Sequence, residues 1–218
     1  MNYIVVLGEL KIKNRSKEET DSERLQKMLT KLNDRFRLDM EVSFFMEGET
    51  SFRGILKRSE NLFQIIKIIQ FNLSPAEARF GIGIGKMDRT ETFTGSVIGT
   101  SGTAIEIAKV CLKKGQMLEK ELGAQVPDVV VSSEEDNDER DMLLMTFMLL
   151  LQTIEKRWTI SQREIMIERL KPGADIEDIA INLGISKETI SDNLKQASYY
   201  AYSRTIVMCK RICEKILS

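Results

Sequence analysis

The sequence predicts an α+β domain followed by an all-α region, and three patterns support this division. Short apolar, β-branched runs alternate with amphipathic helical stretches over residues 1–136, as in a sheet covered by helices. Residues 137–158 form one strongly apolar helical stretch, which predicts a connecting helix. Residues 159–218 contain only helical patterns, separated by glycine and by N-capping residues. We therefore expect three units with these bounds.

Composition excludes several kinds of chemistry. The chain has 218 residues, a formal net charge of −1 and no histidine, so the common zinc sites, histidine bases and Ser-His-Asp triads are excluded. This charge provides no overall positive field for nucleic acid, although a small surface can be locally basic. Cys111, Cys209 and Cys213 are expected to be reduced, half-buried core residues. No stretch is long enough for a membrane span and residues 1–10 lack a basic leader, so we expect a cytoplasmic protein.

The first part of the N-terminal domain predicts a strand, a helix and a hairpin. Residues 3–7 have the pattern of a buried strand, and residues 21–36 carry the apolar stripe of an amphipathic helix. Two further strands, 41–46 and 51–56, are expected to form a hairpin. The next helix, at 62–71, is apolar nearly all round and should therefore pack on the sheet.

A glycine-rich strand is the most distinctive string of the chain. Residues 78–85 read ARFGIGIG, and every second residue from 81 to 85 is glycine. Because side chains alternate along a strand, one face has no side chains there, so a helix, another backbone or a ligand can approach closely. A helix at 105–122 and a strand at 126–131 complete the order βαββαβαβ, with a mixed or antiparallel sheet.

The C-terminal domain has the pattern of a helix-turn-helix. A capping box at 161–164 opens the first helix, and Lys-Pro-Gly at 171–173 ends it. The second helix is expected at 175–183, Gly184 makes the left-handed turn, and Ser186 caps the third helix. This segment resembles the helix-turn-helix of sigma factors and of two-component response regulators.

The exposed side of the third helix offers donors and acceptors for base edges and phosphates. The expected DNA-binding residues are Lys187, Thr189, Ser191, Asn193, Lys195 and Gln196. Base contacts would fall to Lys187, Thr189, Ser191 and Asn193. Phosphates would be held by Lys195 and Arg204. Glu188 and Asp192 lie on the same side, so a module kept for packing or protein contact is the alternative.

The third helix is expected to continue to Leu217. An apolar stripe runs along it at steps of three and four residues, formed by Ile190, Leu194, Ala197, Ala201, Met208, Ile212 and Ile216. Such spacing is typical of a helix–helix seam, which predicts a homodimer, and core packing explains it equally well.

Together with the first strand, the strand at 52–56 and the segment 99–112, the RFGIGIG string resembles the SatD family over nearly the whole chain. These proteins are similar in layout to the palm fold of nucleotide cyclases and diguanylate cyclases, and many end in a helix-turn-helix. The resemblance implies a ferredoxin-like, palm-type βαββαβ order for the N-terminal domain and an all-α, DNA-binding C-terminal domain.

The resemblance also implies where a metal site would lie. Palm enzymes use carboxylates to hold two metal ions against a nucleotide triphosphate. Their first acidic position falls on Glu9, and their hairpin motif falls on residues 49–54, where both of its acids are missing although Glu47 and Glu49 are close. A third acidic position falls on 101–103, which is Ser-Gly-Thr. Glu9, Glu47 and Glu49 are therefore the candidate ligands for magnesium or a nucleotide, and the altered acids favour a chain without turnover.

These observations predict a cytoplasmic, dimeric DNA-binding transcriptional regulator. Its N-terminal domain would sense a small molecule or act as a scaffold, and no resident cofactor is expected. One alternative is a metal-dependent nucleotide-binding or cyclase-like enzyme that uses Glu9 with Glu47 or Glu49. The other is a protein-interaction adaptor in which the helix-turn-helix is structural.

Overall fold

The computed structural model describes residues 2–11, 18–92, 95–98, 101–123, 126–134, 138–171 and 173–217. The strands are β1 (Tyr3–Lys11), β2 (Met40–Met46), β3 (Ser51–Leu56), β4 (Glu77–Gly85), β5 (Arg89–Thr92), β6 (Gly95–Ile98) and β7 (Val129–Ser133). The helices are α1 (Glu18–Arg35), α2 (Leu62–Leu73), α3 (Thr103–Leu122), α4 (Asp138–Glu155), α5 (Ile160–Arg169), α6 (Ile176–Leu183), α7 (Lys187–Gln196) and α8 (Tyr199–Leu217). The α+β class is confirmed, and the β5–β6 hairpin is an addition to the expected elements. Residues 99–100, Pro172 of the expected helix stop and the expected boundary at 136–137 lie outside the described residues.

A five-stranded sheet forms the centre of the N-terminal part, in the order β2-β3-β1-β4-β7. Strand β1 pairs antiparallel with both β3 and β4, whereas β4 and β7 are parallel. This register places Glu9 between Ser51 and Arg79. Because directly paired residues project to the same face, these three side chains lie on one side of the sheet.

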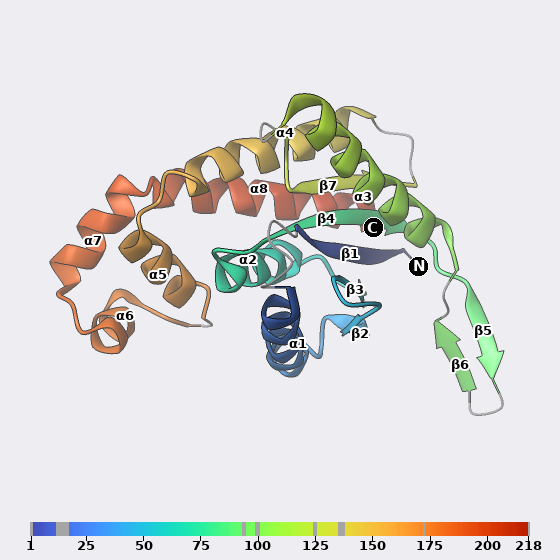
Figure 1. Ribbon diagram of the computed structural model, residues 1–218, viewed down its shortest axis with the longest axis horizontal. Coiled ribbons are helices and arrows are strands. Elements are labelled where there is room, and N and C mark those ends of the chain that lie inside the picture. Colours follow the sequence, from blue (N-terminus) through green and yellow to red (C-terminus); the bar gives the residue numbers. More distant parts are fainter. Residues whose placement is uncertain are drawn as a thin grey trace.

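Helix α3 covers one face of the sheet, and the glycines of β4 allow its close approach. A Cβ atom on Gly81 would lie 2.3 Å from the carbonyl oxygen of Ala108, and one on Gly83 would lie 2.1 Å from that of Ala104. The helix backbone therefore rests directly on the strand, which confirms that this side-chain-free face receives a helix. Helices α1, α2 and α8 pack on the opposite face through a separate core (Figure 1).

Helices α4 and α8 run from the sheet toward α5, α6 and α7, which lie at one end of the molecule (Figure 1). The buried side of α4 faces β7 and α8 and includes Leu144, Met148 and Leu151. Its other side leaves Met142 and Leu150 exposed, so this helix is covered on one side only. Among the described helices, none has the length and apolar character that a membrane crossing requires.

The C-terminal helix is broken, which corrects the expectation that the third helix continues to Leu217. Helix α7 ends at Gln196, and Ser198 adopts a φ of 56°, in the left-handed region that non-glycine residues rarely occupy. The indole N–H of Trp158 donates a hydrogen bond of 2.9 Å to the carbonyl oxygen of Ala197. That bond satisfies an acceptor left free by the helix end, and α8 then returns toward the sheet.

The expected seam is divided by this break. Its members differ in burial. Four are buried (Ile190, Leu194, Ala197 and Ile216), Ile212 is half-buried, and Ala201 and Met208 are exposed. Core packing therefore accounts for most of the stripe. Cys209 and Cys213 of α8 are free and fully buried, and burial raises the pKa of both thiols to about 12. These cysteines are core residues as expected, but they are fully buried and not half-buried.

A buried ion pair joins α2 to the helices that lead to the C-terminal unit. The Lys67 ammonium of α2 lies 2.6 Å from a carboxylate oxygen of Glu155 in α4, and both side chains are buried. The Tyr202 hydroxyl of α8 donates to the same oxygen at 2.6 Å. Burial and then the Glu155 carboxylate raise the pKa of Tyr202 well above its usual value, so the phenol stays protonated and donates. Three helices therefore meet at one carboxylate.

Replacing Gly83 with alanine is expected to destabilise the protein by about 2–3 kcal/mol, because the added Cβ would overlap backbone atoms of α3. Urea unfolding followed by circular dichroism measures the change. Gly48→Ala is the matched control, since nothing lies within 4 Å of a Cβ atom built there. Equal stability of the two variants would contradict the close packing of α3 on β4.

Lys67→Met is expected to cost about 3–5 kcal/mol of unfolding free energy, because it leaves the Glu155 carboxylate buried without its counter-ion. The triple variant Lys67→Met/Glu155→Leu/Tyr202→Phe should recover most of this loss, since it leaves neither a buried charge nor a buried hydroxyl without an acceptor. Lys27→Met is the control: its ammonium is 78% exposed and pairs with Glu23 at the surface, so a change of about 0.5 kcal/mol or less is expected. A Lys67→Met loss as small as that of the control would show that the pair is not buried.

Candidate functional site

Helices α6 and α7 are joined by a short turn, and capping residues fix where each helix begins and where α6 ends. The Asp175 side chain caps α6, Gly184 ends it with a φ of 65°, and the Ser186 hydroxyl accepts a hydrogen bond at the start of α7. Ile179 of α6 and Ile190 of α7 are both fully buried between the helices of this unit. The expected roles of Gly184 and Ser186 are therefore confirmed, and the first residues of α7 project outward.

The capping box of α5 differs from the expected one. Thr159 accepts a hydrogen bond from the Gln162 amide, and the Gln162 side chain accepts one from the Thr159 amide at 3.0 Å. The expected box, at Ser161 and Glu164, lies inside the helix. The helix begins two residues earlier because the buried Trp158 ends the preceding turn and leaves Thr159 in the extended conformation of an N-cap.

The outer side of α7 is polar and uncovered. Lys187, Ser191 and Lys195 follow one another at intervals of four residues, which places them along one side of the helix. The Asn193 side chain donates 2.8 Å to the Thr189 carbonyl oxygen of its own helix, so its amide is turned toward the backbone. Gln196 is exposed at the end of α7, and Arg204 is exposed on α8.

The two lysines of this surface are paired with carboxylates. Lys187 lies 2.7 Å from Glu177 of α6, and the hydrogen bond to that carboxylate is the main cause of a raised Lys187 pKa. Lys195 lies 3.7 Å from Asp192. Over residues 175–196 five carboxylates accompany two lysines, so the α6–α7 surface is acidic in net charge. Any phosphate that binds here must compete with these carboxylates.

Two of the candidate metal ligands are engaged by other side chains, and the third is exposed. The Glu9 carboxylate lies 3.3 Å from Arg79 and accepts 2.7 Å from the Gln116 amide. Glu47 lies 3.1 Å from Arg53, and the Glu49 side chain is exposed. The described residues contain no group of three carboxylate or thiol side chains able to hold a metal ion. These residues therefore do not fit the magnesium site that a palm enzyme would need.

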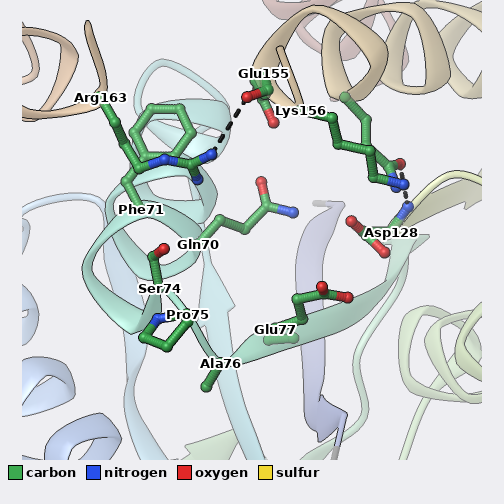
Figure 2. A pocket seen from close by; sticks show the side chains of 12 residues that line it. Gln70, Phe71, Ser74, Pro75, Ala76, Glu77, Asp128, Glu155, Lys156 and Arg163 are labelled. Atoms are coloured by element: carbon green, nitrogen blue, oxygen red, sulfur yellow. Dashed lines mark hydrogen bonds between the residues drawn. The ribbon is translucent and has the colours of Figure 1, made fainter. Parts of the chain in front are cut away.

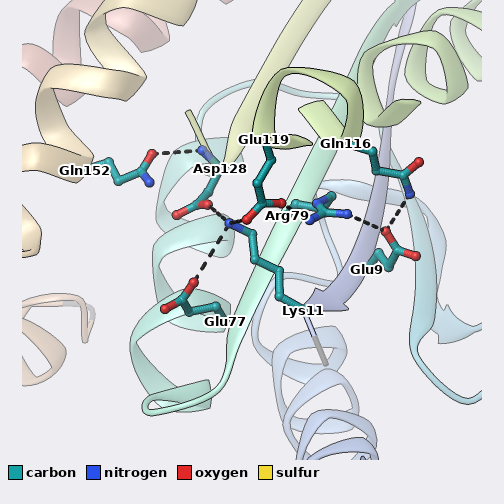
Figure 3. Close-up of polar contacts among 8 residues, drawn as sticks. All are labelled: Glu9, Lys11, Glu77, Arg79, Gln116, Glu119, Asp128 and Gln152. Atoms are coloured by element: carbon teal, nitrogen blue, oxygen red, sulfur yellow. Dashed lines mark hydrogen bonds and ion pairs between the residues drawn. The ribbon is translucent and has the colours of Figure 1, made fainter. Parts of the chain in front are cut away.

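Glu9 belongs to a chain of ion pairs at the end of β1 (Figure 3). Arg79 bridges Glu9 and Glu119, and Lys11 contacts Glu119 at 3.1 Å and also Asp128. Burial alone would lower the Lys11 pKa, but the carboxylates of Asp128 and Glu119 raise it. Burial would likewise raise the Glu119 pKa, but Lys11 and Arg79 lower it. The carboxylates of this region are engaged by Lys11 and Arg79, although four carboxylates share these two cations.

A polar pocket of about 240 Å³ lies beside this network, where α2, β4, α4 and α5 meet (Figure 2). Carboxylates of Glu77 and Asp128 line it together with the cationic side chains of Lys156 and Arg163. The Arg163 guanidinium donates 3.3 Å to the carbonyl oxygen of Glu155. With both charges present on its walls, the pocket favours neither anionic nor cationic ligands.

Comparisons with known proteins place the chain in a family. A family model described as "SatD family" matches residues 3–212. The chain belongs to the SatD family. A search of curated proteins finds no match. Among solved structures, the crystal structure of the guanylyl cyclase Cya2 is similar to this SatD-family protein with 10% sequence identity and a TM-score of 0.37, covering 58% of this chain and 80% of that chain.

Sequence reasoning missed the residues that attach the C-terminal unit of this SatD-family protein to its sheet. Lys67 is the only charged residue in α2, the helix expected to be apolar nearly all round. A single charge in such a helix indicates a buried partner or a functional role. The partner, Glu155, lies 88 positions later in the sequence, at the end of α4, so no local pattern could identify it.

Mg²⁺ with ATP or GTP is expected to leave the melting temperature of this SatD-family protein unchanged, because Glu9 and Glu47 are already held by arginine side chains. Differential scanning fluorimetry, with EDTA as the metal-free reference, tests this. An upward shift that requires Mg²⁺ and disappears in Glu9→Gln would contradict the ion-pair interpretation and support the enzyme alternative.

Proposed function

We propose that this protein is a DNA-binding transcriptional regulator in which α6 and α7 form a helix-turn-helix and α7 is the recognition helix. The observation that carries the proposal is the polar side of α7, on which the exposed Lys187 and Lys195 are aligned with the half-buried Ser191. A helix of this kind, projecting from a capped turn, has the shape that enters the major groove. Thr189 and Gln196 are exposed at the two ends of the same surface.

In this proposal the α+β domain, with a palm-like layout, senses a ligand or acts as a scaffold. A homodimer would present two copies of α7 to adjacent half-sites, and such a regulator would act in the cytoplasm. The α5–α7 unit lies at one end of the molecule, away from the β5–β6 hairpin (Figure 1), which leaves its outer side accessible.

The acidic carboxylates set a condition on this function. Lys187 must exchange Glu177 for a DNA phosphate, and Lys195 must exchange Asp192, so each phosphate contact costs an existing ion pair. We therefore expect modest affinity with a strong dependence on salt. Direct hydrogen bonds from Ser191 and Thr189 would then provide a large share of the sequence preference.

A protein-docking function is the second candidate, and one observation favours it. The same α6–α7 surface is acidic overall and exposes Ile181, whose relative accessibility is 74%. An acidic surface with an exposed aliphatic side chain suits a basic, partly apolar protein partner better than a phosphate backbone.

Selection from sheared genomic DNA of the source organism separates the two candidates. Purified protein retains fragments that are then sequenced, and their binding is titrated against salt. Enrichment of a common, roughly palindromic sequence with a steep salt dependence supports the regulator. No enrichment over the input at low salt would refute DNA recognition by α7 and favour protein docking.

Glu177→Gln is expected to strengthen DNA binding about fivefold at low salt, because it frees Lys187 and removes a negative charge from the interface. Lys187→Gln should weaken binding and lower the salt dependence by about one phosphate contact. Fluorescence anisotropy with a selected duplex measures both.

The control for this pair is Glu23→Gln in α1, which removes a carboxylate from another exposed lysine–glutamate pair. It should leave DNA affinity unchanged, since α1 lies away from α7 (Figure 1). If Glu177→Gln and Glu23→Gln had the same effect on affinity, α6 and α7 would not form the DNA-binding surface.

A further inference from the structure

A second pocket, of about 350 Å³, opens between α2, α5 and α8. Its walls are largely apolar and aromatic, with contributions from Phe63, Met166, Leu170, Tyr199, Ile206 and Val207. This volume is within the range of pockets that bind small molecules, and a mostly apolar lining with a few polar groups is typical of them. It is separate from the polar pocket of Figure 2, and the buried Lys67–Glu155–Tyr202 cluster lies between the two.

Arg169 provides the charge of this pocket. Its terminal nitrogens donate to neutral groups, the carbonyl oxygen of Ala174 and, at 3.0 Å, the Tyr199 hydroxyl. Its guanidinium also lies over the Tyr199 ring, 5.4 Å from the centroid. The Nε atom is buried and has no hydrogen-bond partner. Among the described residues no carboxylate pairs with Arg169, so a half-buried guanidinium without a counter-ion lines the apolar space.

The other charges of the pocket are paired or lie at its rim. Lys210 lies at its edge and pairs with Glu214 of the next helical turn at 3.7 Å. The Lys67 ammonium is neutralised by Glu155, as described above. Glu60, the acid of the lining, is exposed to solvent at the rim. Among the cations that line the pocket, Arg169 is therefore the one without a carboxylate partner in the described part of the chain.

We propose that this pocket binds a small amphipathic carboxylate. Its aromatic or aliphatic body would fill the space between Phe63, Met166 and Ile206. The carboxylate would accept hydrogen bonds from the Arg169 guanidinium, in exchange for its bonds to neutral groups. A charge-assisted contact of this kind supplies the counter-ion that Arg169 lacks, and the apolar walls provide most of the binding free energy.

This site extends the proposed function, because α5 forms one of its walls. A bound carboxylate ties α5 to α2 and α8 and thereby fixes the orientation of the α6–α7 surface. The regulatory effect rests on the proposed DNA binding, whereas occupation of the pocket does not. A direct binding measurement therefore fails or succeeds independently of any effect on DNA.

The test uses the full chain with phenylpropionate and octanoate as probes, and phenylpropanamide as the uncharged match of the first. Saturation-transfer NMR and melting temperature report binding. We expect both acids to bind and to raise the melting temperature, and the amide to bind about tenfold more weakly or worse. Absence of binding by both acids, or equal binding of phenylpropionate and its amide, would overturn the proposal.

Two variants locate the site. Arg169→Gln is expected to weaken both acids about ten- to a hundredfold while leaving the amide unchanged. Val207→Trp fills the pocket from its half-exposed mouth and should abolish binding of all three probes, even if Arg169→Gln does not fold. Ile181→Trp, on the exposed surface of α6, is the matched control and should bind normally. Unchanged binding in Val207→Trp would place the acids elsewhere and refute this pocket.

Discussion

The buried pair of Lys67 and Glu155, shared with Tyr202, is the interaction on which the arrangement of the two halves depends. An ammonium and a carboxylate removed from water are tolerable only when they are paired and hydrogen-bonded. Helices α2, α4 and α8 each supply one member, so a single relative position of the three satisfies all of them. Apolar packing alone would tolerate small sliding movements, whereas this set of short polar contacts does not. The orientation of α5–α7 with respect to the sheet follows from that position.

The opposite face of the sheet obeys the same electrostatic constraint with a different result. Carboxylates gather near the end of β1, and Arg79 and Lys11 join them through ion pairs that connect β1, β4 and α3. Arg79 thereby engages Glu9, one of the carboxylates considered as a metal ligand. These contacts hold the edge of the sheet against α3.

Local patterns in the sequence predicted most elements correctly, because strand alternation, helical stripes, Gly184 and the Ser186 cap act within a few residues. The glycine face of β4 was predictable for the same reason, although the helix that covers it was one of three options. The break at Ser198 was missed because the apolar stripe continues across it without glycine or proline, and the bond that stabilises it comes from Trp158. The partners of Glu9 were missed because they depend on the sheet register and on where α3 packs. Local sequence patterns specify neither of these.

Trp158 has a further consequence, since it is the single tryptophan of the chain. Its ring lies 5.5 Å from that of Phe71 in α2 and 4.9 Å from that of Tyr202 in α8, and its N–H holds the end of α7. The protein therefore carries one indole fluorophore beside its four tyrosines, placed where its two halves meet. Emission from this indole reports on separation of the halves, while far-ultraviolet ellipticity reports on loss of the helices themselves. Heating the unmodified protein and following both signals distinguishes loosening of that joint from melting of the whole fold.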